Sequence, residues 1–196
     1  MHTASFQLFQ AARAHLYGGE VSLGIHPIKT IHFENSLSIV YGDNKGVKGK
    51  PLHPDAKYLP FIPPTHGITE LRFDFSNEAS HIIKGFIKAQ LEYYAAQNRA
   101  YIEFGTETPT PGYALFNAGT GCTFTNKAGK SILSVYIMGN NLFDRAYQDH
   151  LNRLKYFVWQ TASGYTVPSP NGGYGIYNMG RNISFKIDVP LDFTSK

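Results

Sequence analysis

The chain has 196 residues, of which 42% are hydrophobic and 14% aromatic, and its formal net charge is +4. It contains no run of eighteen apolar residues that would predict a transmembrane helix, and its single cysteine, Cys122, excludes an internal disulfide and a cysteine-rich metal site. No cluster of Lys and Arg suggests a nucleic-acid partner. The 13 Tyr, 14 Phe and 19 Gly residues are typical of an all-β protein with many turns.

Alternation of apolar and polar residues predicts a series of β-strands, because successive side chains of a strand point to opposite faces. The clearest case is 183–193, where six large apolar residues alternate with five polar or small ones. A segment at 5–11 is a poor strand candidate. The predicted strands, in chain order, are 17–25, 31–41, 69–75, 83–95, 112–124, 131–139 and about 180–193.

The connections between these strands alternate in length. Short polar segments at 26–30, 76–80 and 125–130 indicate tight turns. Long segments lie between them, at 42–64, 97–111 and 144–177, and loops of that length are usually functional. Short turns at one end and long loops at the other are typical of bacterial outer-membrane barrels, with periplasmic turns and extracellular loops.

Charged residues occur in the middle of several predicted strands, opposite the apolar positions. In a soluble barrel or sandwich they would face solvent and the aliphatic face would form the core. In a large membrane barrel they would line a wet lumen and the aliphatic face would meet lipid. The length of the strands at 83–95 and 180–193 favours the membrane alternative. The charged residues are Glu20, Glu34, Glu70, Arg72, Asp74, Lys84, Lys88, Glu92, Lys186 and Asp188.

Five short segments, taken in order, resemble the C-terminal barrel region of TonB-dependent outer-membrane receptors. They are YGGEV at 17–21, PFIPP at 60–64, PGY at 111–113, NNLFD at 140–144 with Tyr147, and GRNI at 180–183. The continuation of the fourth segment, DHLNRLK at 149–155, resembles the version in receptors of Bacteroidetes-type bacteria.

The resemblance implies an antiparallel up-and-down transmembrane β-barrel segment, about seven or eight strands of a 22-stranded barrel in the bacterial outer membrane. Residues 1–196 would be a single region covering the last third of that barrel. We find no counterpart of the plug domain, the TonB box or a signal peptide, so we expect either a fragment of a longer receptor or a truncated gene product.

The resemblance also implies a function and a set of partners. The family takes up iron-siderophores, haem, cobalamin or glycans. The expected partners are outer-membrane lipid, the plug and remaining strands, the TonB complex through the parent receptor, and the barrel-assembly machinery. The last would read a C-terminal signal formed by Val189, Leu191 and Phe193, here followed by residues 194–196.

The loop at 144–177 is the best candidate for ligand contact, because it combines cations with aromatic rings that suit anionic chelates and flat ligands. The alternative is an aromatic girdle near the lipid headgroups, with the loop packed on itself. The candidate residues are His150, Arg153, Lys155, Tyr156, Trp159, Tyr165 and Tyr174.

We expect no enzymatic activity, no metal site and no cofactor. The sequence contains no G-x-S-x-G, no H-E-x-x-H and no His-x-His pattern. Two other hypotheses remain at this point: a self-contained soluble up-and-down β-barrel that binds a small apolar ligand, and a small structural outer-membrane barrel.

Overall fold

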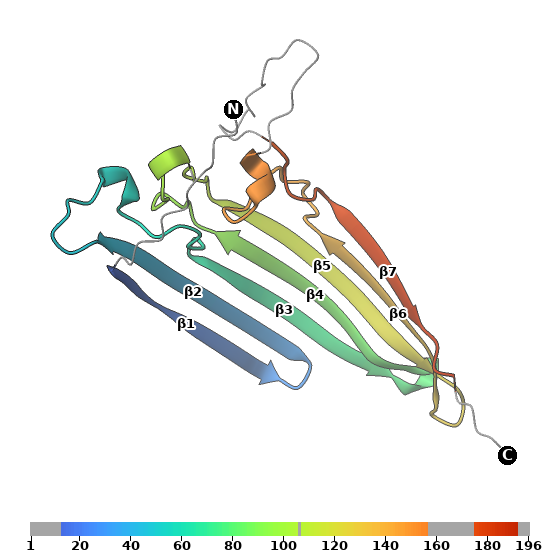
Figure 1. The fold of residues 1–196 in the computed structure, drawn as a ribbon. Coiled ribbons are helices and arrows are strands. Elements are labelled where there is room, and N and C mark those ends of the chain that lie inside the picture. The colour runs from blue at the N-terminus through green and yellow to red at the C-terminus, as the bar shows by residue number, and fades with distance from the viewer. Residues whose placement is uncertain (1–12, 106, 157–174, 192–196) are drawn as a thin grey trace, which may run out of the picture.

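The computed structural model describes residues 13–105, 107–156 and 175–191. Seven strands form one antiparallel sheet in which each strand pairs with the next along the chain (Figure 1). This arrangement confirms the predicted all-β, up-and-down fold. The strands are β1 (Arg13–Ile28), β2 (Ile31–Gly46), β3 (His66–Asn77), β4 (Ile82–Tyr94), β5 (Tyr113–Thr125), β6 (Ser131–Asn140) and β7 (Asn182–Asp188). Short 3-10 helices occur at η1 (Pro54–Ala56), η2 (Glu78–Ser80), η3 (Glu103–Gly105) and η4 (Arg153–Tyr156).

All seven predicted strands are present, but several of their ends differ from the prediction. β1 and β2 pair from Arg13↔Gly46 to Ile28↔Ile31, so both extend well beyond their alternating segments. β7 ends at Asp188, which pairs with Ser134, and not near residue 193. Pro190 follows closely and has no N–H to donate to a sheet ladder. The weak candidate at 5–11 lies outside the described residues.

The strand register gathers the apolar side chains on one face of the sheet. These side chains remain uncovered: Leu71 is 53% exposed, Ile87 57% and Phe185 71%. Among the described residues no large side chain is fully buried, and the buried hydrophobic residues are Ala56, Ala100 and Leu115. A soluble sheet would cover such a face with a second layer. One row that crosses all seven strands consists of Ile25, Phe33, Leu71, Ala89, Ala118, Gly139 and Ile183.

One polar pair lies within the apolar face, and its members satisfy each other. Asn35 and Thr69 face each other across β2 and β3, and Asn35 Nδ2 donates a hydrogen bond to Thr69 Oγ1 at 2.5 Å. Polar groups are expensive in an apolar environment unless they are hydrogen-bonded. This face can therefore meet lipid without leaving that amide unpaired.

The short and long connections lie at opposite ends of the sheet (Figure 1). The β1–β2, β3–β4 and β5–β6 turns lie at one end, and the loops 47–65, 95–112 and 141–181 follow the other ends of the strands. Within the described residues β1 pairs with β2 alone and β7 with β6 alone. The described strands thus form an open sheet and not the closed barrel that either alternative hypothesis requires. No helix in the described part of the chain is long and apolar enough to cross a membrane.

Candidate functional site

The face opposite the apolar surface carries a hydrogen-bonded polar network across β3, β4 and β5. Glu70 Oε2 accepts hydrogen bonds from Lys88 Nζ at 2.9 Å and Gln90 Nε2 at 3.3 Å. Asn117 Nδ2 donates to Gln90 Oε1 at 3.0 Å and to Glu92 Oε1 at 2.6 Å. Register places the predicted mid-strand charges on this same face, except Lys84, which falls in a register shift. The chemistry of this surface suits a water-filled lumen.

A row of aromatic rings stands on the polar face where the strands meet the long loops. His66, Tyr94 and Tyr113 are cross-strand neighbours in β3, β4 and β5. Ring centroids are 5.5 Å apart for His66–Tyr94, 4.6 Å for Tyr94–Tyr113 and 4.5 Å for Tyr113–Tyr147. Tyr113 Oη donates to Asp149 Oδ2 at 2.9 Å. The row therefore anchors the start of the third long loop to the sheet.

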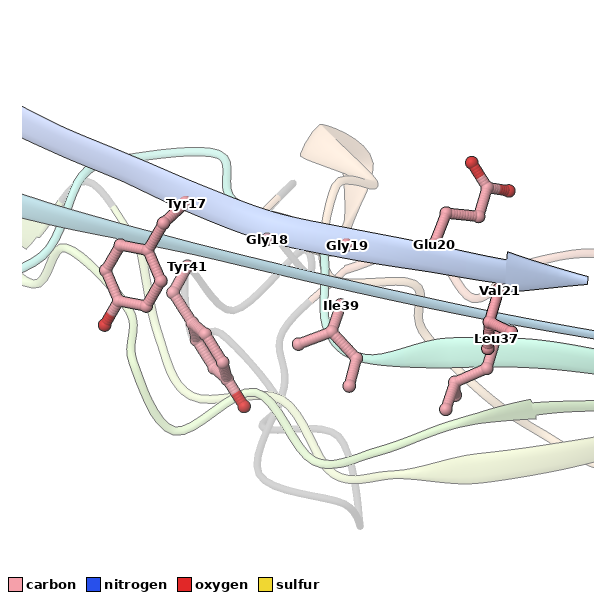
Figure 2. A pocket seen from close by; sticks show the side chains of 8 residues that line it. All are labelled: Tyr17, Gly18, Gly19, Glu20, Val21, Leu37, Ile39 and Tyr41. Atoms are coloured by element: carbon pink, nitrogen blue, oxygen red, sulfur yellow. The ribbon is translucent and has the colours of Figure 1, made fainter.

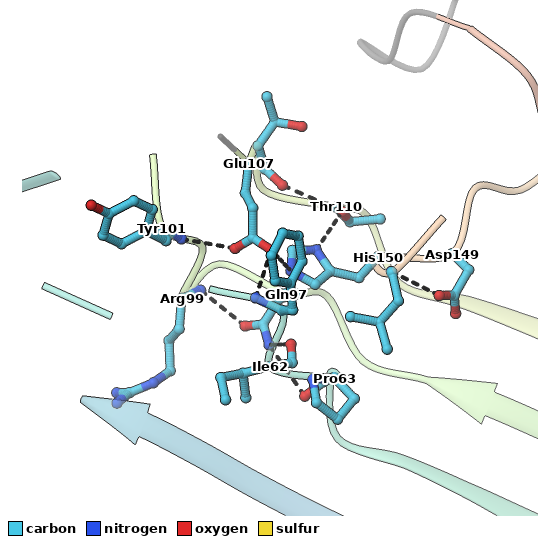
Figure 3. A network of polar contacts seen from close by, with 12 residues as sticks. Ile62, Pro63, Gln97, Arg99, Tyr101, Glu107, Thr110, Asp149 and His150 are labelled. Carbon is cyan, nitrogen blue, oxygen red and sulfur yellow. Dashed lines mark hydrogen bonds and ion pairs between the residues drawn. The ribbon is translucent and has the colours of Figure 1, made fainter. Parts of the chain in front are cut away.

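Glu107, in the loop 95–112, ties two of the long loops together. Its side chain is 2% exposed. Its Oε1 accepts from the backbone N–H of Phe61 at 2.7 Å, and its Oε2 accepts from that of Tyr101 at 3.0 Å (Figure 3). Gln97, in the same loop, donates from Nε2 to the carbonyl oxygen of Ile62 at 3.0 Å. Two buried side chains of one loop thus hold the backbone of the loop 47–65.

The third loop joins the same network through His150 and Lys155. His150 Nδ1 lies 2.9 Å from Thr110 Oγ1, and its Nε2 lies 3.8 Å from Glu107 Oε1 (Figure 3). Lys155 Nζ donates to Thr110 Oγ1 at 2.8 Å. Burial, followed by the charge of Lys155, lowers the pKa of His150, while Glu107 and Asp149 act in the opposite direction. We call the three connected segments, residues 47–65, 95–112 and 141–156, the loop layer.

The candidate ligand residues of the third loop occupy different environments. His150 and Lys155 are each 3% exposed, and the contacts described above are all to other loops. Arg153 is exposed, and its guanidinium lies 4.7 Å from the centre of the Phe61 ring. Tyr156 is half-buried and accepts a hydrogen bond from the Thr108 N–H at 3.0 Å. A role in ligand contact stays a prediction for all four.

The other candidate residues follow β7 or lie outside the described part of the chain. Trp159, Tyr165, Tyr174 and Phe193 lie outside the described residues. Val189 and Leu191 follow β7 and are 56% and 70% exposed. Their predicted part in barrel assembly stays a prediction.

The sequence pattern did not indicate Gln97, Glu107 or Thr110, which hold the loop layer together. Each is a single polar residue in an irregular segment, and its partners lie up to 46 residues away along the chain. A lone Glu in the segment ETPTP is ordinarily solvated, so no local signal separates it from an exposed carboxylate. Its acceptor role depends on how the loops pack.

Hollows of different size lie on the two faces of the described sheet. A cavity of about 130 Å³ adjoins the aromatic row, lined by Pro111, Tyr113, Arg145, Tyr147 and other residues. It is small compared with the roughly 300–1,000 Å³ of ordinary ligand pockets. A shallow groove of about 480 Å³ lies on the apolar face. There Tyr17, Tyr41 and Leu37 point to one side of the sheet and Glu20 to the other (Figure 2).

Comparison with known proteins shows a likeness in structure. No protein-family model matches the chain, and a search of curated proteins found no match. The chain is similar to a solved structure of the copper transporter OprC, with a TM-score of 0.66 and 19% sequence identity. The alignment covers 90% of this chain and 24% of that one, so the chain spans about a quarter of the transporter's length. The likeness supports the prediction of a β-barrel segment.

Proposed function

We propose that the chain forms part of the wall of an outer-membrane receptor barrel that takes up a scarce nutrient with energy delivered by TonB. The observation that carries the proposal is the two-sided sheet. One face is predominantly apolar and uncovered, the other is charged and hydrogen-bonded, and both edges of the described sheet are open. Open edges cannot stand in lipid, so further strands must complete the wall.

The proposal assigns a task to each part of the structure. The apolar face contacts outer-membrane lipid and the polar face lines the lumen, where it would meet a plug domain. The loop layer lies on the extracellular side and contributes to ligand recognition. The short turns face the periplasm, from which the TonB complex acts through the parent receptor. Residues after β7 would be read by the barrel-assembly machinery. None of these tasks is catalytic.

The proposed cargo is a scarce nutrient of the iron-siderophore, haem, cobalamin or glycan type. The exposed guanidinium of Arg153 beside two aromatic rings fits an anionic or flat ligand, through charge and stacking. The similarity to a copper transporter is compatible with a metal or metal chelate as the cargo. The small cavity beside the aromatic row would not hold such a ligand by itself.

The first test is the size and location of the native product. Cells of the source organism are fractionated, and an antibody against residues 144–177 detects the protein in the outer-membrane and soluble fractions. We expect a band in the outer-membrane fraction that is several times larger than the 21.9 kDa of this chain. A 21.9 kDa band in the soluble fraction would refute the proposal. A band of that size in the membrane fraction would replace it with a small outer-membrane barrel.

A further inference from the structure

The β1–β2 hairpin brings two histidines together on the polar face, close to the short turn. Ile25 pairs with Phe33 and Ile28 with Ile31, so His26 and Pro27 together oppose the single residue His32. Two residues opposite one constitute a β-bulge, which changes the direction of a side chain. Pro27 fits such a position because it has no N–H for the ladder. His26 lies opposite His32 in the register set by Ile25 and Phe33, and their ring centroids lie 4.9 Å apart.

The two imidazoles are hydrogen-bonded to each other through their Nδ1 atoms, and a carboxylate lies near the Nε2 atom of each. His26 Nδ1 and His32 Nδ1 are 2.9 Å apart. His26 Nε2 lies 3.5 Å from Glu34 Oε1, and His32 Nε2 lies 3.1 Å from Asp74 Oδ2. The four side chains thus form the row Glu34–His26–His32–Asp74. Arg72 Nε, 2.6 Å from Asp74 Oδ1, holds the last carboxylate in place.

The two Nδ1 atoms share one hydrogen bond, so one ring donates its N–H and the other accepts through its lone pair. His32 Nε2 makes no hydrogen bond to the nearby Asp74 carboxylate. A metal ion that replaced the shared proton would be held by the Nδ1 lone pairs of both rings.

We infer that His26 and His32 form a binding site for a divalent transition-metal ion, bound through the two Nδ1 atoms. Imidazole suits Cu²⁺, Zn²⁺ and Ni²⁺. Outer carboxylates usually accept the other ring N–H of metal-binding histidines, and Glu34 and Asp74 lie 3.5 Å and 3.1 Å from those ring nitrogens. Zn–N bonds of about 2.0–2.1 Å in tetrahedral geometry require roughly 3.3 Å between the nitrogens. The rings must separate by a few tenths of an ångström, and the 52% exposure of the His26 side chain leaves room for this.

Two protein ligands leave the remaining coordination positions to water or to groups that arrive with the metal. Within the described residues no group of three or more His, Cys, Asp or Glu side chains is placed to hold a metal ion. A site with two ligands exchanges its metal more readily than a closed structural site. It therefore fits a metal ion or metal chelate that moves along the polar face better than a permanently bound cofactor.

The test is Cu²⁺ binding to the native product, purified in detergent, with electron paramagnetic resonance to detect nitrogen ligands. We expect His26→Ala and His32→Ala each to lose one bound Cu²⁺ per chain, together with its two-nitrogen signal. Glu34→Gln keeps both imidazoles but removes an orienting carboxylate, and should weaken binding about 10- to 100-fold. His53→Ala is the matched control, because His53 lies in an exposed loop beside Asp55 and outside the row.

The outcomes separate the alternatives. Unchanged Cu²⁺ stoichiometry and affinity in both His26→Ala and His32→Ala would refute the site and leave a shared proton between the rings. Loss in one variant alone would refute binding by the pair. A folded barrel migrates differently in SDS gels with and without heating, so loss of that difference would identify a variant that fails to fold. In that case the affinity of Glu34→Gln for Cu²⁺ decides the question. Binding is measured without transport, so this result does not depend on the proposed function.

Discussion

Replacing Glu107 should release the loop layer while leaving the sheet intact. The carboxylate is 2% exposed and accepts two backbone hydrogen bonds, from Phe61 at 2.7 Å and Tyr101 at 3.0 Å. A hydrogen bond to a charged group contributes about 1.5–3 kcal/mol, and part of that gain offsets the desolvation of the buried carboxylate. Glu107→Ala should therefore destabilise the closed loop layer by about 2–4 kcal/mol.

The conservative variant Glu107→Gln sharpens this prediction. It keeps the shape of the side chain but replaces one accepting oxygen with a donating NH₂ group, so one of the two amides loses its partner. We expect a smaller loss of about 1–3 kcal/mol. Glu20→Ala is the control, because Glu20 is an exposed carboxylate on the polar face of β1. Its replacement should change the loop layer by less than about 0.5 kcal/mol.

Hydrogen exchange followed by mass spectrometry measures the effect on the native product in detergent. Peptides that contain Phe61 and Tyr101 should exchange about 30- to 700-fold faster in Glu107→Ala, since each 1.4 kcal/mol corresponds to a factor of ten. Peptides from β3 and β4 should exchange at the wild-type rate. Unchanged protection of Phe61 and Tyr101 would show that packing, and not the hydrogen bonds to this carboxylate, holds the loops together.

Three further predictions concern the apolar face, the acid response of the loops and a close contact in the sheet. Leu71→Arg should reduce the free energy of unfolding in lipid vesicles by about 2–4 kcal/mol, and Ser22→Arg on the polar face by much less. If urea titrations gave equal losses of unfolding free energy for Leu71→Arg and Ser22→Arg, the assignment of the two faces would be wrong. Burial holds the pKa of His150 below its usual 6.5, so the closed loops bind fewer protons than the open ones. Loop stability should be complete above about pH 6.5 and fall as the pH decreases through the folded-state pKa. Proteolysis of the loop layer should accelerate at pH 5, and His150→Asn should abolish this acceleration. Gly85→Ala should cost about 1–3 kcal/mol, because a Cβ there would overlap the Phe75 ring. A melting temperature equal to the wild type would show that the ring moves aside freely.

Much of the sheet was predictable from the sequence, because its determinants are local. Alternation in 183–193 and in 31–41 identifies strands, and it also separates an apolar face from a polar one before any pairing is known. Alternation does not fix where a strand ends. β1 extends to Arg13 because β2 provides a partner up to Gly46, whereas β7 ends at Asp188.

The loops were predictable in length but not in conformation. Aromatic and cationic residues made His150 and Lys155 candidates for ligand contact, yet both side chains are buried among other loops. Both side chains contact Thr110, which is 40 residues from His150 and 45 residues from Lys155 along the chain. Contacts across such separations have no local signature, because they form only when three loops pack together.

The sequence by itself determined that the protein is a series of two-faced strands, since a side-chain period of two residues needs no partner to be recognised. The tertiary structure determined which residues of different strands come together on each face. Register joined the apolar halves of seven strands into one uncovered surface and placed Glu70, Lys88 and Asn117 within hydrogen-bonding reach on the other. The buried carboxylate of Glu107 joined two of the loops. Each of these features depends on distances between residues far apart in the chain, which only the folded backbone fixes.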